Sequence, residues 1–236
     1  MLSNLDSGAI FVKAHLMNQL FTLLISALTL SCLGQVDKVS NPLDFLPEGY
    51  ILFDTIYGDL NKDGIDDCLL IIKGTDKENI VINRFDEEVD RNRRGILVLL
   101  KKKDSYQLAI KNYACFASEN EDGGVYFPPQ LSIEINKGNL YVQYGHGRYG
   151  HWQYTFRYQN SDFELIGYDI SNGGAVIDSE TSINFLSKKK LKKVNTNFDA
   201  EGGDEVYEET WENIEISELI KLSEIEDFFE LDMRVY

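Results

Sequence analysis

Cysteine is scarce in this sequence of 236 residues, which contains three cysteines, the first of them in an apolar N-terminal stretch. The other two, Cys68 and Cys115, each sit in an apolar run of the kind that forms a buried strand. A disulfide between them and two separate buried thiols fit the sequence equally well. Neither has a neighbouring histidine or basic residue that would indicate a nucleophile.

The motifs of common hydrolases and nucleotide-binding enzymes are also absent. The sequence contains no GxSxG, no GxxxxGK[ST] and no HExxH. Two histidines, His146 and His151, follow the N-terminal stretch. In a regular strand this spacing puts them on opposite faces, although the glycines around them allow a bend that brings them together. Surface or aromatic-cluster histidines are the favoured interpretation over a metal-binding or catalytic pair.

No apolar run is long enough to span a bilayer. Leu20–Leu33 has about fourteen residues, whereas a transmembrane helix needs about 20. Lys13 precedes this run and small residues follow it, which is the pattern of a secretory signal. We therefore expect residues 1–34 to be a signal peptide cleaved after Gly34, with Met17 as an alternative start.

A second interpretation of the leader makes Cys32 a lipid-modified cysteine. The residues before it, Thr29–Ser31, fit the rule for such sites imperfectly. The chain would then be an outer-membrane lipoprotein. Soluble export to the periplasm or the extracellular space is the favoured prediction.

Positive charge is in deficit, because 39 Asp and Glu residues face 23 Lys and Arg residues and give a formal net charge of −16. A chain this acidic should repel nucleic acids and anionic membranes, and no nucleic-acid partner is expected. Cations and basic partners remain compatible with it, and high solubility is the usual consequence of such a charge.

The remaining sequence, 35–236, has the length of a single domain with a sizeable core. Its patterning predicts a mainly β fold, an antiparallel sheet or sandwich built of hairpins. Strands are expected at 50–57, 69–73, 95–100, 106–115, 131–135, 140–144, 152–158, 163–168 and 183–186. The end of the chain, 211–232, fits either a strand or a short C-terminal helix, because its apolar residues match both periods.

Four polar segments interrupt this pattern. Asp86–Arg94 alternates acids and bases and predicts an exposed loop with weak local ion pairs. Ser171–Thr181 is expected to be a turn-rich link. Lys188–Lys193 predicts a charged hairpin turn or a sheet edge protected by lysines. Asp199–Glu209 is strongly acidic, which favours a mobile segment.

The most specific pattern lies between two of the expected strands, in GDLNKDGIDDCLLIIK. Side chains with oxygen atoms occupy positions 1, 3, 5 and 9 of a loop, and these are Asp59, Asn61, Asp63 and Asp67. Gly64 at position 6 permits the turn, and Ile65 at position 7 offers its backbone carbonyl. Calcium prefers about six to eight oxygen ligands, which short side chains on alternate residues can supply. The sequence therefore predicts a Ca²⁺ site, with an acidic turn without metal as the alternative.

At position 12 an EF-hand carries a bidentate Glu, but this chain has Leu70 within a strand-like run. A loop of this spacing that leads into a strand resembles the calcium loops of FG-GAP and VCBS repeats, found in propeller blades and secreted bacterial proteins. The run Leu131–Tyr168 looks like the C-terminal part of uncharacterised secreted bacterial proteins with such a loop near their start. These resemblances imply export, a β fold and calcium, but no activity. The loop occurs once, which favours a lone module over a propeller.

Three functions are compatible with these features. The favoured one is a non-catalytic exported protein that binds a glycan or a cell-envelope partner through an aromatic strand at 152–158. The second is a metal-dependent hydrolase, and the third is a purely structural envelope protein. The candidate binding residues are His146, Arg148, His151, Trp152 and Tyr154. The hydrolase requires His146, Arg148 and His151 to converge in a cleft.

Overall fold

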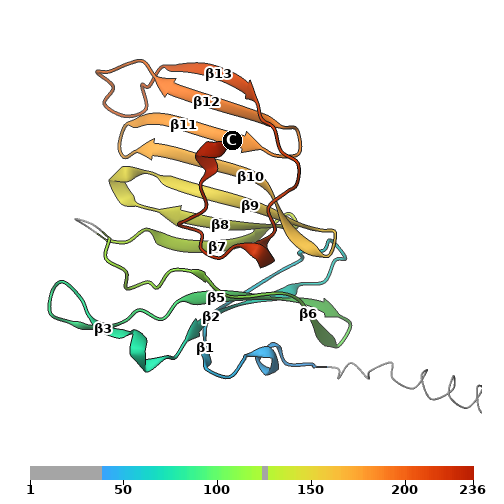
Figure 1. Ribbon diagram of the computed structural model, residues 1–236. Helices are drawn as coiled ribbons and strands as arrows, with labels where there is room; N and C mark the ends of the chain where they lie inside the picture. The colour runs from blue at the N-terminus through green and yellow to red at the C-terminus, as the bar shows by residue number, and fades with distance from the viewer. Residues whose placement is uncertain (1–38, 124–126) are drawn as a thin grey trace, which may run out of the picture. The chain divides into compact units, whose positions relative to one another are not determined.

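The computed structural model describes residues 39–123 and 127–236, and Val39–Tyr236 forms a compact unit. The predicted signal peptide, its cleavage site and Cys32 lie outside the described residues. Within them the fold is mainly β, with antiparallel sheets of four, seven and two strands (Figure 1). The predicted fold class is thus confirmed at the level of an antiparallel β protein built of hairpins. No helix in the described part of the chain is long and apolar enough to cross a membrane.

The four-stranded sheet has the order β1-β2-β5-β6. Its strands are β1 (Tyr50–Gly58), β2 (Asp67–Gly74), β5 (Arg94–Lys102) and β6 (Ser105–Phe116). All four were predicted, because their apolar and β-branched runs are bounded by turn residues. The expected calcium loop joins β1 to β2 at one end of this sheet.

Both faces of the two central strands, β2 and β5, are buried, which explains why their sequences are continuously apolar. One face joins the main core, and the other forms a smaller cluster with Phe45, Leu46, Tyr50 and Tyr106. Cys68 lies in the smaller cluster and Cys115 in the main core. Both cysteines are free, so the two separate buried thiols are the alternative that the structure supports.

The seven-stranded sheet follows the chain order as a meander, β7 to β13. Its strands are β7 (Gln130–Asn136), β8 (Asn139–Gly145), β9 (His151–Gln159), β10 (Asp162–Gly173), β11 (Ile177–Asn184), β12 (Lys189–Asn195) and β13 (Tyr207–Asn213). One face is apolar, and its residues on β8 to β11 pack in the main core. The opposite face carries polar residues, as strict alternation along the strands requires.

A C-terminal segment, residues 214–236, crosses the apolar face of this sheet in extended form (Figure 1). Leu165 N–H donates to the Ile220 carbonyl at 2.8 Å, and Phe228 N–H donates to the Cys115 carbonyl at 3.1 Å. The predicted short helix is absent from this segment, which contains only the 3₁₀ turns η5 (Leu222–Glu224) and η6 (Met233–Val235). The spacing of its apolar residues is compatible with a helix, but the segment is extended because its apolar side chains pack against the sheet.

Two polar segments of the seven-stranded sheet differ from the prediction. Lys188 lies in the turn between β11 and β12, as expected. Lys189–Lys193 belong to β12, which is not an edge, because it pairs with β11 on one side and β13 on the other. Lys190 is only 8% exposed, and its ammonium group reaches the carbonyl of Tyr236. The link expected at Ser171–Thr181 is shorter, since β10 ends at Gly173 and β11 begins at Ile177. The acidic stretch Asp199–Glu209 ends within β13.

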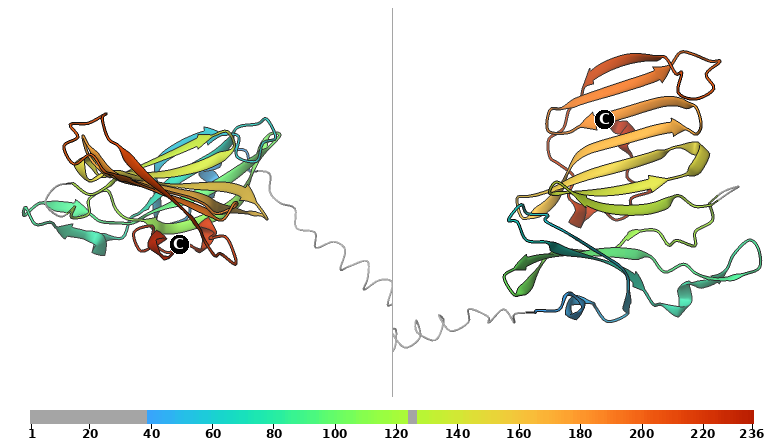
Figure 2. Two further views of the ribbon diagram at one scale, coloured as in Figure 1. Left: turned by 90° about the horizontal axis from the view of Figure 1, so that it is seen from above. Right: turned by 180° about the vertical axis from the view of Figure 1, so that it is seen from behind.

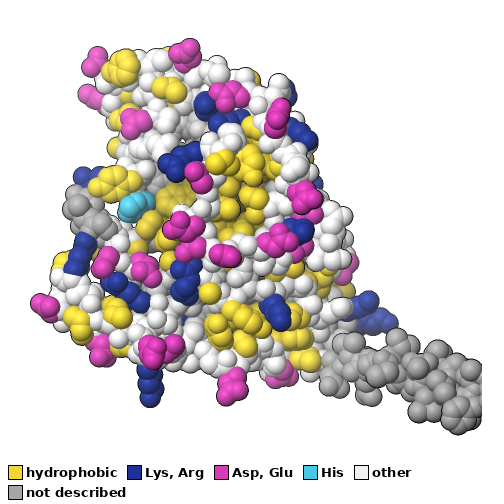
Figure 3. Space-filling model, in the orientation of Figure 1, with side chains coloured by type: hydrophobic (Ala, Val, Ile, Leu, Met, Phe, Trp, Pro, Cys, Tyr) yellow, Lys and Arg dark blue, Asp and Glu magenta, His cyan; other side chains and the backbone are white. Residues whose placement is uncertain are grey.

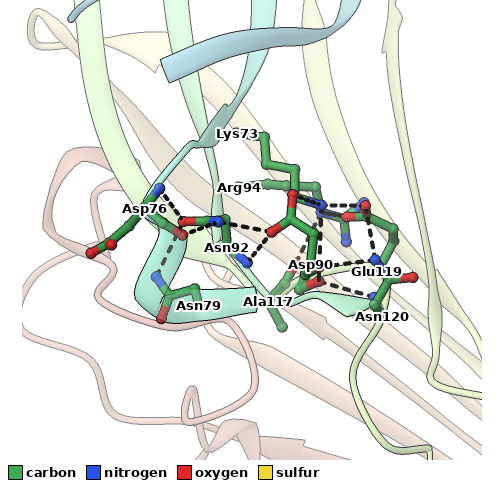
Figure 4. A network of polar contacts seen from close by, with 10 residues as sticks. Lys73, Asp76, Asn79, Asp90, Asn92, Arg94, Ala117, Glu119 and Asn120 are labelled. Carbon is green, nitrogen blue, oxygen red and sulfur yellow. Dashed lines mark hydrogen bonds and ion pairs between the residues drawn. The ribbon is translucent and has the colours of Figure 1, made fainter. Parts of the chain in front are cut away.

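In the segment Asp86–Arg94, only Asp86 and Glu87 form the expected exposed loop. The segment then contains β4 (Glu88–Asp90), which pairs with β3 (Ile80–Ile82), and enters β5. Asn92 and Arg94 are buried within a polar network (Figure 4). Its centre is Lys73 on β2, whose Nζ lies 3.1 Å from Asp90 Oδ2. The prediction of weak surface pairs is therefore wrong here, because the partners converge from distant parts of the chain.

Further bonds in this network tie the loop after β6 to the four-stranded sheet (Figure 4). Glu119 forms an ion pair with Lys73, and Arg94 Nε donates to the Ala117 carbonyl at 2.9 Å. Asn120 Nδ2 donates to the Asp90 carbonyl at 2.9 Å. Each buried cationic side chain thus has oxygen partners, which is the condition for burying such groups.

Candidate functional site

The predicted calcium loop curls tightly between the end of β1 and the start of β2. Asp59 accepts hydrogen bonds from the backbone N–H groups of Asp63 (3.1 Å) and Gly64 (2.9 Å). Asp63 Oδ1 accepts from the N–H of Ile65 at 2.9 Å, and Asn61 Oδ1 accepts from that of Asp63 at 2.9 Å. Gly64 has φ +84°, the left-handed conformation for which glycine was expected at position 6. Asp59, Asn61 and Asp63 therefore point inward on the loop.

Asp67 occupies a different position from these three side chains. It is fully buried, and its two carboxylate oxygens accept from the N–H groups of Leu60 (2.9 Å) and Lys101 (2.8 Å). It therefore ties the start of the loop to β5. Burial raises the pKa of the Asp67 carboxyl, and the two backbone hydrogen bonds oppose that rise.

The donor chemistry of the loop suits a hard cation, because every candidate ligand is an oxygen atom. A carboxylate oxygen that accepts one N–H retains a second lone pair for a metal. No ion pair in the described part of the chain neutralises Asp59, Asp63 or Asp67. However, residues 39–123 and 127–236 contain no group of three or more His, Cys, Asp or Glu side chains arranged to hold a metal ion. The donor types fit calcium, while the carboxylates are engaged with the backbone of the loop.

The aromatic strand predicted at 152–158 corresponds to β9. Its four aromatic residues share the apolar face of the sheet, but Tyr154 and Phe156 are buried in the main core. Trp152 and Tyr158 are half-buried beside them. The C-terminal segment covers this row, with Phe228 placed 5.1 Å from the Tyr154 ring. Part of the expected contact surface is therefore core.

A groove of about 800 Å³ remains between this face and the C-terminal segment. Trp152 and Tyr154 line one side, while Phe228, Phe229 and Asp232 belong to the C-terminal segment on the other. Figure 3 shows apolar side chains on this side of the molecule with charged ones among them. Burial raises the pKa of Tyr154, and its hydroxyl donates to the Phe228 carbonyl at 3.3 Å.

Four of the five charged side chains that line the groove are paired among the described residues, and Glu230 is the exception. Lys190 and Lys192 both lie near Glu212, at 3.7 and 3.0 Å. Arg234 pairs with Asp232 at 2.7 Å. The groove thus combines aromatic rings and hydrogen-bonding groups with little uncompensated charge, which suits a neutral ligand better than an ion.

The three candidate residues of a hydrolase site do not converge. His146 and Arg148 line a pocket of about 330 Å³, and the His146 Nε2 lies 2.9 Å from the Phe127 carbonyl oxygen. His151 lines two other pockets, both shared with Asp169. The five candidate binding residues thus divide between three places, and only Trp152 and Tyr154 lie in the groove of about 800 Å³.

The residues of the C-terminal segment in this groove were missed by reasoning from the sequence. The two-residue spacing of the aromatic side chains identified the face of β9, but Phe228 and Phe229 follow about 75 residues later. No local pattern indicates that such a distant segment covers this face.

Searches against protein-family models, curated proteins and solved structures found no match to this chain.

Proposed function

We propose that the chain is an exported, non-catalytic β protein that binds a glycan of the cell envelope or its surroundings. The observation that carries this proposal is the groove beside Trp152, which has the size of a small-molecule site. Aromatic rings stack on the apolar faces of sugars, and nearby polar groups bond their hydroxyls. Trp152 is the stacking residue of this proposal, with Phe229 and Asp232 on the opposite wall.

Calcium has a structural role in the proposal. Asp59, Asn61, Asp63 and Asp67, with the carbonyl of Ile65, would hold the ion. When bound, it neutralises the carboxylates of the loop and adds free energy to the folded state. The loop's own hydrogen bonds already hold Asp59, Asn61 and Asp63 inward, which lowers the entropy lost on binding.

Fluorescence of Trp152 provides the test of the groove. The chain has two tryptophans, so Trp211→Phe leaves Trp152 as the only one. We expect a saturable change in its emission on titration with neutral oligosaccharides of glucose, galactose, mannose or N-acetylglucosamine. Phe229→Ser, in the groove wall, should weaken this binding at least tenfold, whereas Phe198→Ser, at a fully exposed phenylalanine away from the groove, should not. The absence of any change with all four sugar types would refute the proposed site.

The burial of Tyr154 and Phe156 favours a purely structural envelope protein as the second candidate. In that case the C-terminal segment fills the apolar face, and the groove binds nothing. A hydrolase is not proposed, because His146 and His151 line different pockets.

A further inference from the structure

The polar face of the seven-stranded sheet, on the side opposite the C-terminal segment, carries an ordered row of side chains, most of which form hydrogen bonds. Strand register aligns one residue from each strand across the sheet: Ser132, Gln143, Gln153, Asp169, Ser182, Leu191 and Trp211. None of these seven belongs to a hydrophobic core cluster of the described chain. Figure 2 shows the seven strands from behind, with the C-terminal segment beyond them.

Two grooves open along this row and meet at His151 and Asp169. The larger, of about 530 Å³, is lined by Ser132, Gln143 and Gln153 among others. The smaller, of about 310 Å³, continues past Ser182 toward the β12 side of the sheet. Because both contain His151 and Asp169, they form one continuous depression across neighbouring strands.

Two features of the lining leave polar atoms available for a ligand. The side-chain amide of Gln143 donates to Gln153 Oε1, which orients both side chains. This bond leaves the Oε1 of Gln143 as an acceptor and the Nε2 of Gln153 as a donor. Ser171, in the smaller groove, is only 5% exposed, and its hydroxyl has no hydrogen-bond partner in the protein. A buried hydroxyl without a partner weakens the fold unless a ligand or water satisfies it.

The charges of this face argue against an anionic ligand. Lys193 lies 3.5 Å from Glu180 and 3.9 Å from Glu209, so its charge is compensated within the sheet. The net charge of −16 opposes the approach of an anionic polymer. Amide, hydroxyl, imidazole and carboxylate groups together match the many hydroxyls of a sugar chain.

The row is also long. It crosses six steps between neighbouring strands, each about 4.8 Å, and therefore spans about 29 Å. At the β13 end lies Trp211, whose side chain is 64% exposed and can stack on a sugar ring.

We propose that this face binds a neutral, linear polysaccharide that lies across the strands from Ser132 to Trp211. The site shares a carbohydrate ligand with the proposed function but lies on the other face of the sheet.

Affinity electrophoresis of the full chain tests this proposal, with hydroxyethyl cellulose, mixed-linkage β-glucan, galactomannan or dextran in the gel. We expect retardation by at least one of these polymers. Gln153→Ala and Ser182→Arg should each reduce it at least tenfold. The second variant places a long charged side chain at an exposed position of the row, so its effect does not depend on loss of packing. Phe229→Ser, in the groove of the other face, should retain retardation.

The two faces are distinguished by their tryptophans. In Trp152→Phe, Trp211 alone reports, and its emission should change on addition of the polymer that retards the chain. Oligosaccharides of increasing length should bind more tightly until they span the row. No retardation by any of the four polymers, or equal retardation of Ser182→Arg and the unaltered chain, would overturn the proposal. A response of Trp152 without one of Trp211 would support the other groove and refute this one.

Discussion

Replacement of Asn92 by alanine should destabilise the chain far more than its place in a charged segment suggests. Asn92 is 2% exposed. Its Oδ1 accepts from the N–H of Asp76 at 3.0 Å and from the side chain of Asn79 at 3.1 Å. Its Nδ2 donates to the Asp76 carbonyl at 2.9 Å and to Asp90 Oδ1 at 2.8 Å. The side chain thus uses both its donors and its acceptor oxygen to hold η3 (Lys77–Asn79) and β4 against β5.

The expected loss follows from these four bonds. A hydrogen bond contributes about 1 kcal/mol net, which gives about 4 kcal/mol for Asn92→Ala. The partners lie partly at the surface and regain water after the substitution, so we expect a loss of about 3 kcal/mol in the free energy of unfolding. Urea denaturation, followed by far-ultraviolet circular dichroism, measures this value.

Asn83→Ala is the matched control, since Asn83 makes three hydrogen bonds in the turn between β3 and β4 but is partly exposed. Water replaces those bonds readily, and we expect a loss below about 1 kcal/mol. Equal losses for the two variants, or a loss under about 1 kcal/mol for Asn92→Ala, would show that the network does not stabilise the fold.

Three other outcomes are expected. Phe228→Ala should lower the unfolding free energy by about 3–5 kcal/mol, because Phe228 is buried among the rings of the main core. Phe229→Ala, at the half-exposed neighbouring residue, should lower it by about 1 kcal/mol in the same denaturation assay. In chelator, we expect the unaltered chain to lose unfolding free energy relative to Asp67→Asn as pH rises from the ordinary aspartate pKa to the raised folded-state pKa of Asp67. The reason is that, in this pH range, the folded chain holds a proton on Asp67 that the unfolded chain has released. A difference between the two chains that does not depend on pH would contradict the raised pKa. Mass spectrometry of the exported protein should find Gln35 at the N-terminus, whereas a lipid on Cys32 would identify a lipoprotein.

Local pattern was sufficient to predict most strands of this fold. The runs at 95–100 and 106–115 and the alternation at 131–144 became β5, β6, β7 and β8, because burial of one or both faces imposes periods that are visible in the sequence. The calcium loop was also local, since all its oxygens lie within nine residues. Its inward-pointing side chains agree with the predicted spacing, and the metal itself remains a prediction.

The errors arose where distant residues determine burial. Lys188–Lys193 indicated a hairpin turn or an edge, but β12 is an inner strand. Lys190 and Lys192 pair with Glu212 of β13, and Lys193 pairs with Glu209 of the same strand. The long aliphatic stem of Lys190 is buried while its ammonium group reaches Tyr236 at the end of the chain. The side chain of Asn92 is buried because Asp76 and Asn79 supply partners from the segment before β3. Arg94 is buried because the Ala117 carbonyl and Glu119 supply partners from the segment after β6. No short-range pattern carries that information.

The calcium-dependent shift of the melting temperature tests the central claim most directly. Calcium at 100 times its dissociation constant adds about 2.7 kcal/mol to the folded state, which corresponds to a rise of about 5–10 °C for a chain of this length. We expect this rise between chelator and excess calcium in the unaltered chain, its loss in Asp63→Ala, and its retention in Asp66→Ala, a neighbouring acid outside the predicted ligand positions. Equal melting temperatures in calcium and in chelator for the unaltered chain would contradict calcium binding by this loop.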